Sequence, residues 1–276
     1  MLGYMRPGPR QVKGRPATGG DRLLTKARKM FYRARGFCQG TLAGEPFRLD
    51  PYHSKFWRKA SAGDWEPETF AALAAHLDKG RDYLDIGAWI GPTVLYAARK
   101  ARHVWCFEPD PTAFRALSWN LELNGIENVS AFAAALSDRV GVARIASFRG
   151  ERGDSMSSLL NAAGTAGSDV LTLGWEDFAG SVDLGGVRLV KIDIEGAEFD
   201  VLPHMIPWLK AQRPALLLST HAPYLDPAER AARMGALAAS LEFYGTWTDK
   251  RLEPVGPEHL TSEDALQGFG TYLLTG

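Results

Sequence analysis

Two segments of the sequence carry side chains suited to acid–base chemistry. Asp193, Glu195 and Glu198 directly follow one apolar run, and His221 follows another. A histidine can take up a proton near neutral pH, and a nearby carboxylate can accept a proton or bind the molecule that gives it up. These residues therefore indicate a site that removes a proton from a substrate hydroxyl group, with His221 as the first candidate for the base.

Two other interpretations of the same residues stay open. Glu195 and Glu198 would also stabilise the N-terminus of a helix that began there, without any part in catalysis. Asp193 and His221, together with Glu195, could instead hold Mg²⁺, which prefers oxygen ligands and lowers the pKa of a hydroxyl group bound to it. We do not favour the metal, and we predict no metal ligand.

A second group of residues is typical of a site for a ribose-bearing cofactor. A short apolar run ends in the glycine turn Asp85-Ile86-Gly87-Ala88-Trp89-Ile90-Gly91, and Glu108 ends the next apolar run, 21 residues beyond Gly87. Glycines let the backbone turn sharply and approach a ligand closely. An acidic residue at that distance accepts hydrogen bonds from ribose hydroxyl groups.

The spacing and charge of this turn favour S-adenosylmethionine over a dinucleotide. The glycines of the turn do not follow the G-x-G-x-x-G pattern of dinucleotide sites. Asp85 would repel a pyrophosphate, but it suits the ammonium and sulfonium groups of S-adenosylmethionine. We therefore predict S-adenosylmethionine as the cofactor and S-adenosylhomocysteine as the product, and we disfavour a nicotinamide-dependent oxidoreductase.

The elements that must position these residues alternate between strand and helix patterns from residue 65 onward. Strands are expected at 83–86, 103–107, 129–136, 142–148, 187–194, 215–219 and 268–274. Helices are expected at 66–77, 93–102, 111–124 and 226–244. This alternation predicts an α/β protein with a doubly wound, mostly parallel sheet, in which ligands bind at the carboxyl ends of the strands. Residues 36–62 show no clear periodicity and are interpreted as irregular.

The sequence resembles the FkbM family of S-adenosylmethionine-dependent methyltransferases. The resemblance covers roughly residues 64–220 and is carried by the segments Tyr83–Gly91, Phe107–Pro111, Asn120–Gly125, Ala135–Asp138, Ser157–Leu159 and Lys191–Glu198. It implies a class I methyltransferase fold, which is Rossmann-like with a seven-stranded sheet and helices on both faces. It also implies O-methylation of a sugar, glycan or secondary metabolite. Trp89 departs from the family pattern, which usually has Asn there.

The resemblance also implies which residues bind the cofactor. The backbone of Gly87, Ala88 and Gly91 would line its methionine portion, with Thr93 at the carboxylate and Glu108 at the ribose. Residues on two further strand ends would border the adenine. The full expected set is Asp85, Gly87, Ala88, Trp89, Gly91, Thr93, Glu108, Pro109, Asp110, Ala135, Leu136, Ser137 and Asp193.

Charge is divided unevenly along the chain, although the 32 basic and 32 acidic residues cancel. Residues 1–35 hold ten basic residues and one acidic residue, so this segment is +9 and the remaining 241 residues are −9. Residues 1–20 are expected to be a disordered basic tail, and 21–35 fit a basic amphipathic helix. The tail could tether the protein to an anionic membrane surface, to an acidic partner or to a second subunit of a homodimer.

We divide the chain into the tail at 1–20, an N-terminal extension or lid at 21–63, and an S-adenosylmethionine-binding methyltransferase domain at 64–276. Four aromatic residues near the lid could stack on a sugar: Tyr52, Phe56, Trp57 and Trp65. Two cysteines are too few for a disulfide framework. No apolar run suits a membrane span or a signal peptide, so we expect a cytoplasmic protein.

Two alternative functions remain to be weighed. The basic N-terminus could serve a nucleic-acid methyltransferase, but an acidic site would repel phosphates, so we predict no nucleic-acid partner. The protein could instead bind S-adenosylmethionine without catalysis, and Trp89 is the feature that favours this. The preferred partner is a small-molecule or glycan hydroxyl acceptor.

Overall fold

The computed structural model of the chain describes residues 30–32, 34–147, 157–158 and 167–276. The expected tail at 1–20 and most of the amphipathic helix at 21–35 lie outside the described residues. At the end of that helix, residues 30–32 and 34–35 are helical. Among the described residues, no helix combines the length and the apolar character that crossing a membrane requires.

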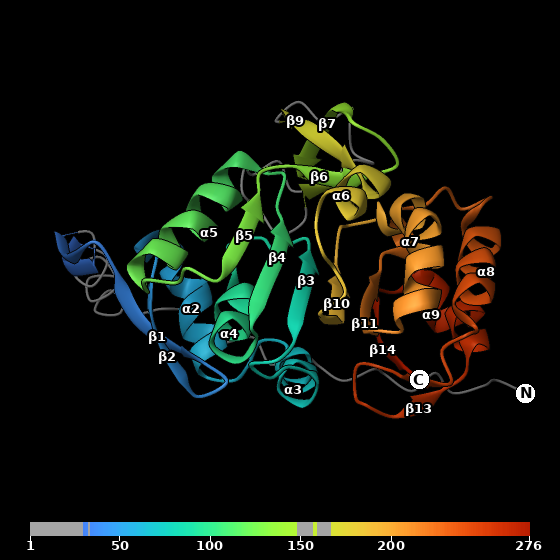
Figure 1. Cartoon of the computed structure of the whole chain (residues 1–276), viewed down its shortest axis with the longest axis horizontal. Coiled ribbons are helices and arrows are strands. Elements are labelled where there is room, and N and C mark those ends of the chain that lie inside the picture. The colour runs from blue at the N-terminus through green and yellow to red at the C-terminus, as the bar shows by residue number, and fades with distance from the viewer. Residues whose placement is uncertain (1–29, 33, 148–156, 159–166) are drawn as a thin grey trace, which may run out of the picture.

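An eight-stranded sheet forms the centre of the molecule (Figure 1). Its strands, in spatial order, are β13 (Pro254–Val255), β12 (Thr246–Thr248), β14 (Gly270–Thr275), β11 (Ala215–Thr220), β10 (Val187–Ile192), β3 (Asp82–Ile86), β4 (His103–Phe107) and β5 (Val129–Phe132). The five strands from β11 to β5 pair in parallel, and β14, β12 and β13 pair antiparallel. The mostly parallel α/β fold is therefore confirmed. Six of the seven expected strands lie in this sheet, and β12 and β13, which the sequence did not indicate, complete it.

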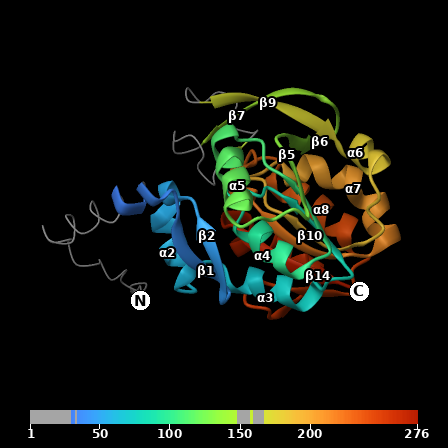
Figure 2. The ribbon, with the colours of Figure 1, turned by 60° about the vertical axis from the view of Figure 1, so that its left-hand side comes forward.

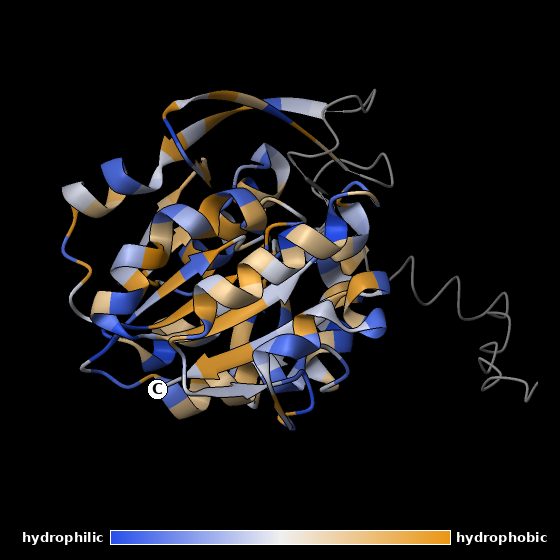
Figure 3. Cartoon of the chain, turned by 90° about the vertical axis from the view of Figure 1, so that its right-hand side faces the viewer, coloured by the Kyte–Doolittle hydropathy of each residue, from blue (hydrophilic) through white to orange (hydrophobic). Residues whose placement is uncertain are grey.

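Helices cover both faces of this sheet, as expected. On one face lie α3 (Pro67–His76), α4 (Pro92–Lys100) and α5 (Pro111–Leu123), and on the other α6 (Trp175–Ser181), α7 (Glu198–Gln212) and α8 (Arg230–Leu241). Successive strand residues alternate between the two cores, since Tyr83 belongs to the first and Leu84 to the second. With both faces covered, the strands carry nearly continuous apolar sequence, and they are largely orange in Figure 3.

The signals at the start of α5 act as the sequence indicates. Asp110 caps α5 by accepting hydrogen bonds from the backbone N–H groups of Thr112 and Ala113, with Pro111 in the first turn. The expected helix at 226–244 is shorter, because residues after Asp226 first form a turn and α8 begins at Arg230. Three short helices complete the C-terminal half: η3 (Ala222–Tyr224), η4 (Pro257–Thr261) and α9 (Glu263–Gln267).

A second sheet lies beside the first and corrects two predictions (Figure 1). Its strands, in order, are β6 (Ala135–Ser137), β9 (Gly167–Gly174), β7 (Gly141–Ser147) and β8 (Ser157–Ser158). The single strand expected at 129–136 was wrong, because the chain leaves the main sheet after Phe132 and joins the second sheet at Ala135. The strand expected at 142–148 exists as β7, but in this second sheet.

The N-terminal extension is regular, which corrects the irregular segment expected at 36–62. It forms a hairpin of β1 (Cys38–Leu42) and β2 (Glu45–Leu49), then η1 (Pro51–His53) and α2 (Ser54–Ser61). Asn120 of α5 accepts a hydrogen bond from the backbone N–H of Asp50 at 2.7 Å, which fixes the extension to the main domain. Figure 2 shows the hairpin and α2 together on one side of the molecule.

Candidate active site

A cavity of about 440 Å³ opens at the carboxyl ends of the parallel strands. One wall comes from the turn between β3 and α4, the end of β4 and the start of β6. The facing wall comes from the segments that follow β10 and β11 and from the start of β14. A third wall comes from α2 and the loop before α3. Its members from the expected set are Gly87, Ala88, Trp89, Thr93, Glu108, Pro109, Ala135, Leu136, Asp193, Glu195 and His221.

The glycine turn after β3 has no room for side chains at its glycines. Gly87 has a φ of +91°, and a β-carbon there would lie 1.9 Å from the carbonyl oxygen of Asp193. Gly91 has a φ of +90° and lies against Leu117. The N–H groups of Gly87 and Ala88 both donate to the carbonyl oxygen of Phe107 at 3.0 Å. The turn is thereby fixed to β4 and to the segment after β10.

Glu108 stands at the end of β4 with both carboxylate oxygens held. One oxygen accepts from the N–H of Trp89 and the other from the N–H of Asp110, each at 2.7 Å. The side chain is buried, and this burial raises its pKa to about 7. Each carboxylate oxygen has a second lone pair, so Glu108 can still accept hydrogen bonds from a ligand in the cavity.

A buried ion pair supports the floor of the cavity. Lys191 Nζ lies 3.4 Å from Asp85 Oδ1 and 3.4 Å from Asp193 Oδ2, and it donates to the carbonyl oxygen of Gly87 at 3.2 Å. Asp85 also accepts hydrogen bonds from Tyr83 and Thr93, at 3.0 and 2.5 Å. Burial opposes the charge on Lys191, but the surrounding carboxylates outweigh it and raise its pKa. The Asp85 side chain therefore faces the protein beneath the turn.

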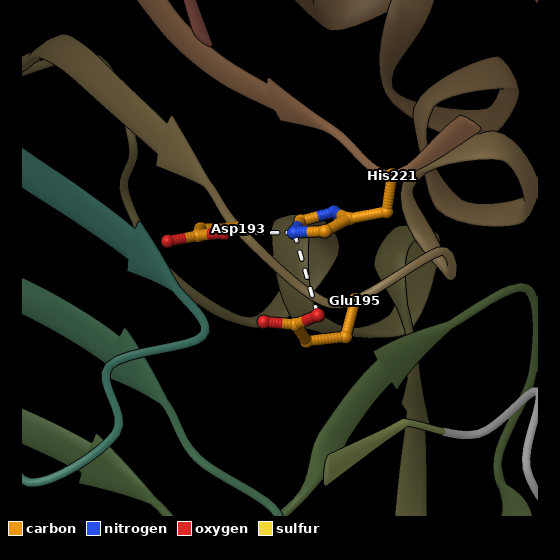
Figure 4. A group of neighbouring side chains, drawn as sticks. All are labelled: Asp193, Glu195 and His221. Carbon is orange, nitrogen blue, oxygen red and sulfur yellow. Dashed lines mark ion pairs between the residues drawn. The ribbon is translucent and has the colours of Figure 1, made fainter. Parts of the chain in front are cut away.

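His221 lies between three carboxylates, and two of them, Asp193 and Glu195, are drawn with it in Figure 4. Its Nε2 is 3.5 Å from both Asp193 and Glu195, and its Nδ1 is 3.2 Å from Glu198. Burial alone would lower the pKa of His221, but Glu198, Asp193 and Glu195 raise it to about 9. Burial likewise opposes ionisation of Asp193, yet Lys191 and His221 outweigh it and lower its pKa. At neutral pH the imidazole is protonated and Asp193 is ionised.

Glu198 acts behind this group. It is fully buried, and its oxygens accept hydrogen bonds from the backbone N–H groups of Gly196 and His221 at 2.8 and 2.7 Å. The carboxylate therefore fixes both the backbone and the ring of His221. Asp193, Glu195 and His221 each offer one atom within 4.8 Å of the others, a spacing that could hold a divalent cation. Because the same atoms form ion pairs with one another, we assign them to those pairs.

Five of the expected site residues lie outside the cavity wall. They are Asp85, Gly91, Asp110, Ser137 and Glu198. Asp110 caps α5, and Gly91 is needed for the close approach of Leu117.

The four aromatic residues expected near the lid divide in the same way. Phe56 and Trp65 line the cavity, where the Phe56 ring lies 4.6 Å from that of Trp89 and 5.0 Å from that of Trp65, measured between centroids. Trp57 is buried in the core, and Tyr52 is exposed elsewhere.

Sequence reasoning missed several residues of the cavity. They are Lys59, Glu66, Lys191 and Phe269. Lys191 could have been found, because a charged residue stands between the apolar residues Val190 and Ile192 of a strand. Glu66 precedes Pro67 and has the sequence signature of a helix start. No local signal distinguishes Lys59 or Phe269 from surface residues.

Comparison with known proteins gives one family and a set of similar structures. The family model described as "Methyltransferase FkbM domain" matches residues 85–245. No curated protein matches the chain. A methyltransferase FkbM from Methylobacillus flagellatus is 13% identical with a TM-score of 0.45, over 94% of this chain and 71% of that one.

Two further structures come from streptococci. A candidate methyltransferase of Streptococcus mutans, solved in complex with SAH, is 10% identical with a TM-score of 0.43, over 74% of this chain and 93% of that one. An rRNA methylase of Streptococcus thermophilus is 13% identical with a TM-score of 0.41, over 74% and 92%.

Proposed function

Since the chain belongs to the FkbM methyltransferase family, we propose that it transfers a methyl group to a hydroxyl group of a sugar, glycan or secondary metabolite. The protein is an S-adenosylmethionine-dependent methyltransferase. The hydroxyl acceptor and the residues that serve it are the parts proposed here.

The cavity fits the cofactor by its chemistry. Glu108 has free lone pairs at the end of β4, where ribose hydroxyl groups would donate. The turn at 87–91 would approach the methionine portion, with Thr93 close by, and Ala135 and Leu136 would border the adenine. Asp193 supplies negative charge for a cationic ligand. When bound, the cofactor supplies a methyl group on a positively charged sulfur, and the residues around it need only orient the acceptor and take its proton.

The observation that carries the proposal is the convergence of Asp193, Glu195 and His221 on one side of the cavity. Ionised carboxylates accept hydrogen bonds, so Asp193 and Glu195 can orient a hydroxyl group. The protonated His221 balances their charge, and Glu198 fixes its ring. A protonated imidazole cannot take up a second proton, so His221 would be a base only as the pH approaches 9.

The third wall supports a sugar as the acceptor. Phe56 and Trp65 present aromatic rings to the same cavity that holds the carboxylates. Apolar ring faces pack on aromatic side chains, while sugar hydroxyl groups need hydrogen-bond acceptors. A cavity that offers both favours a polyhydroxylated ring over a purely apolar acceptor.

A panel of acceptors tests the function. The protein is incubated with S-adenosylmethionine carrying a ¹³C methyl group and with methyl glycosides, uronic acids, phenols, amines and RNA. The expected product is a methyl ether of a glycoside or phenol, seen by mass spectrometry and ¹³C NMR, together with S-adenosylhomocysteine. Asp193→Asn should reduce that product, and Asp226→Asn, on a surface loop away from the cavity, is the matched control. Methylation of the amines alone, or of RNA at base nitrogen or carbon atoms alone, would contradict the proposal of a hydroxyl acceptor.

A further inference from the structure

We propose that Glu66 is the catalytic base, the group that takes the proton of the acceptor hydroxyl. The inference rests on the proposed function, because it presupposes a hydroxyl acceptor. As the acceptor oxygen forms its bond to the methyl carbon, its proton passes to a Glu66 oxygen. The carbon–sulfur bond breaks, its electron pair stays on the sulfur, and Glu66 later releases the proton to water.

The position of Glu66 is the first support. It lines the cavity together with Asp193, Lys191 and His221, although it comes from the loop before α3. A base must reach the hydroxyl group that the facing residues orient, and Glu66 shares a cavity with all of them. Residue 66 also precedes the matched family region at 85–245.

The conformation of Glu66 is the second support. Its backbone is left-handed, with φ 43° and ψ 52°, which costs energy for a residue with a β-carbon. It stands at the N-cap of α3 but makes no capping hydrogen bond to that helix. Its Oε2 accepts from the Thr69 hydroxyl at 3.1 Å instead. Among the described residues, no Lys or Arg forms an ion pair with it. Its side chain therefore caps no backbone N–H group of α3, although it accepts from a hydroxyl in the first turn of that helix.

The charges around Glu66 are the third support. Residue 66 is exposed as a whole, and its side chain lines the cavity. Partial loss of water around the carboxyl group and the Asp193 charge raise its pKa to about 7, against the opposing effects of Lys191 and Thr69, and Asp85 adds to the rise. Lys59 of α2 and His221 face the same cavity and carry positive charge. A carboxylate with a pKa near 7 is ionised in part at neutral pH and holds a proton well once it has taken one.

Among the other ionisable groups in the cavity, Asp193, His221, Lys191 and Glu108 fit less well, and Glu195 is paired with His221. The pKa of Asp193 is lowered, so it binds a proton weakly. His221 and Lys191 already carry protons at neutral pH. Glu108 is held by two N–H groups on the side assigned to the ribose. Asp193 and Glu66 share the field of Lys191, and their pKa values are pushed apart, a pattern typical of acid–base pairs.

The first experiment needs no acceptor. ¹³C NMR of the glutamate carboxyl carbons is recorded over pH 4–9 with S-adenosylhomocysteine bound, in wild type and in Glu66→Gln. Glu68→Gln is the matched control, because Glu68 is exposed in the first turn of the same helix. Besides the signal of Glu108, we expect one further carboxyl signal that titrates near pH 7, and this further signal should disappear in Glu66→Gln and persist in Glu68→Gln. Ionisation of Glu66 near pH 4 would overturn the proposal.

The second experiment asks whether Glu66 faces the reacting centre. Calorimetry gives the ratio of S-adenosylmethionine to S-adenosylhomocysteine affinity at pH 6 and 8. Only the first ligand carries the sulfonium charge, and any effect of Glu108 on the shared ribose cancels in the ratio. We expect the ratio to rise by about threefold or more, because the attraction between unit charges ~6 Å apart contributes about that factor even in water. Glu66→Gln should abolish the rise, and a rise unchanged in that variant would contradict the proposal.

The third experiment uses the acceptor found in the panel. Glu66→Gln should lower kcat about 10²- to 10⁴-fold, with the affinity for S-adenosylmethionine retained to within about threefold. Glu66→Asp should keep part of the rate, and the wild-type rise in kcat near pH 7 should be absent from Glu66→Gln. A wild-type kcat in Glu66→Gln would overturn the base alone. Absence of any hydroxyl methylation by the wild type would instead overturn the proposed function.

Discussion

The α-carbon of Gly87 lies so close to the carbonyl oxygen of Asp193 that a β-carbon would come within 1.9 Å of that oxygen. Gly87 belongs to the turn that we assign to the cofactor, and Asp193 belongs to the group that we assign to the acceptor. A backbone contact therefore sets the distance between the two halves of the site, and no side chain can relax it.

Gly87→Ala should damage both halves. The added carbon meets backbone and must also adopt a positive φ, so we expect a loss of about 2–4 kcal/mol in the free energy of unfolding. Binding of S-adenosylhomocysteine should also weaken. Urea denaturation and calorimetry measure the two effects. Gly180→Ala in α6 is the control, because its β-carbon would meet nothing within 4 Å. Equal losses of stability and of S-adenosylhomocysteine affinity in the two variants would contradict this expectation.

Glu108→Gln should weaken cofactor binding without unfolding the protein. It removes the charge from hydrogen bonds to the ribose, which are worth about 1.5–3 kcal/mol each, so affinity should fall about tenfold or more. Because the pKa of Glu108 is raised to about 7, affinity of the wild type for S-adenosylhomocysteine should rise between pH 6 and 8. That rise should vanish in Glu108→Gln but not in Glu122→Gln, a change at an exposed position on α5. Calorimetry of the wild type and the two variants at both pH values measures these affinities.

Lys191→Met should destabilise the fold. Asp85 is fully buried and would lose its cationic partner, and removal of one member of a buried ion pair typically costs about 3–5 kcal/mol. Asp85→Asn in the same chain should restore part of the loss, because it removes the uncompensated charge. Chemical denaturation of the four proteins gives a double-mutant cycle. Purely additive losses would show that the two groups do not interact.

His221 should make stability depend on pH. Its folded pKa of about 9 lies above the ordinary value of 6.5, so its contribution is complete below pH 6.5 and is lost as the pH rises through 9. The difference in unfolding free energy between wild type and His221→Asn should therefore shrink by up to about 3 kcal/mol from pH 6.5 to 9.5. Urea titrations at several pH values measure it, and a constant difference would mean that the three carboxylates do not hold the proton.

The sequence predicted those parts of the fold that depend on short-range signals. The Asp110 cap and the glycine turn are examples, because their physical causes lie within a few residues. The N-terminal hairpin was missed because its turn, Ala43-Gly44, has positive φ at both positions while Ala rarely marks such a turn. Its buried residues, such as Leu42, depend on partners elsewhere in the chain. The division of the expected strand near Phe132 was likewise missed, because one apolar stretch supplies β5 to the main sheet and β6 to the second sheet.

The site was predicted where its residues sit at strand ends, and missed where it depends on distant pairing. His221 and Asp193 follow buried strands, and the structure brings them together. Lys191 pairs with Asp85, 106 residues away, and no local pattern reveals such a contact. Glu66 has the signature of an ordinary helix start, and only the folded chain places it in one cavity with Asp193.

The third wall of the cavity comes from one short stretch, residues 56–66, which ends before the matched region begins at residue 85. The turn and strand ends assigned to the cofactor all lie after that point. On this assignment, changes at Phe56 and Trp65 would alter which acceptor ring can pack in the cavity while the methyl donor stayed the same.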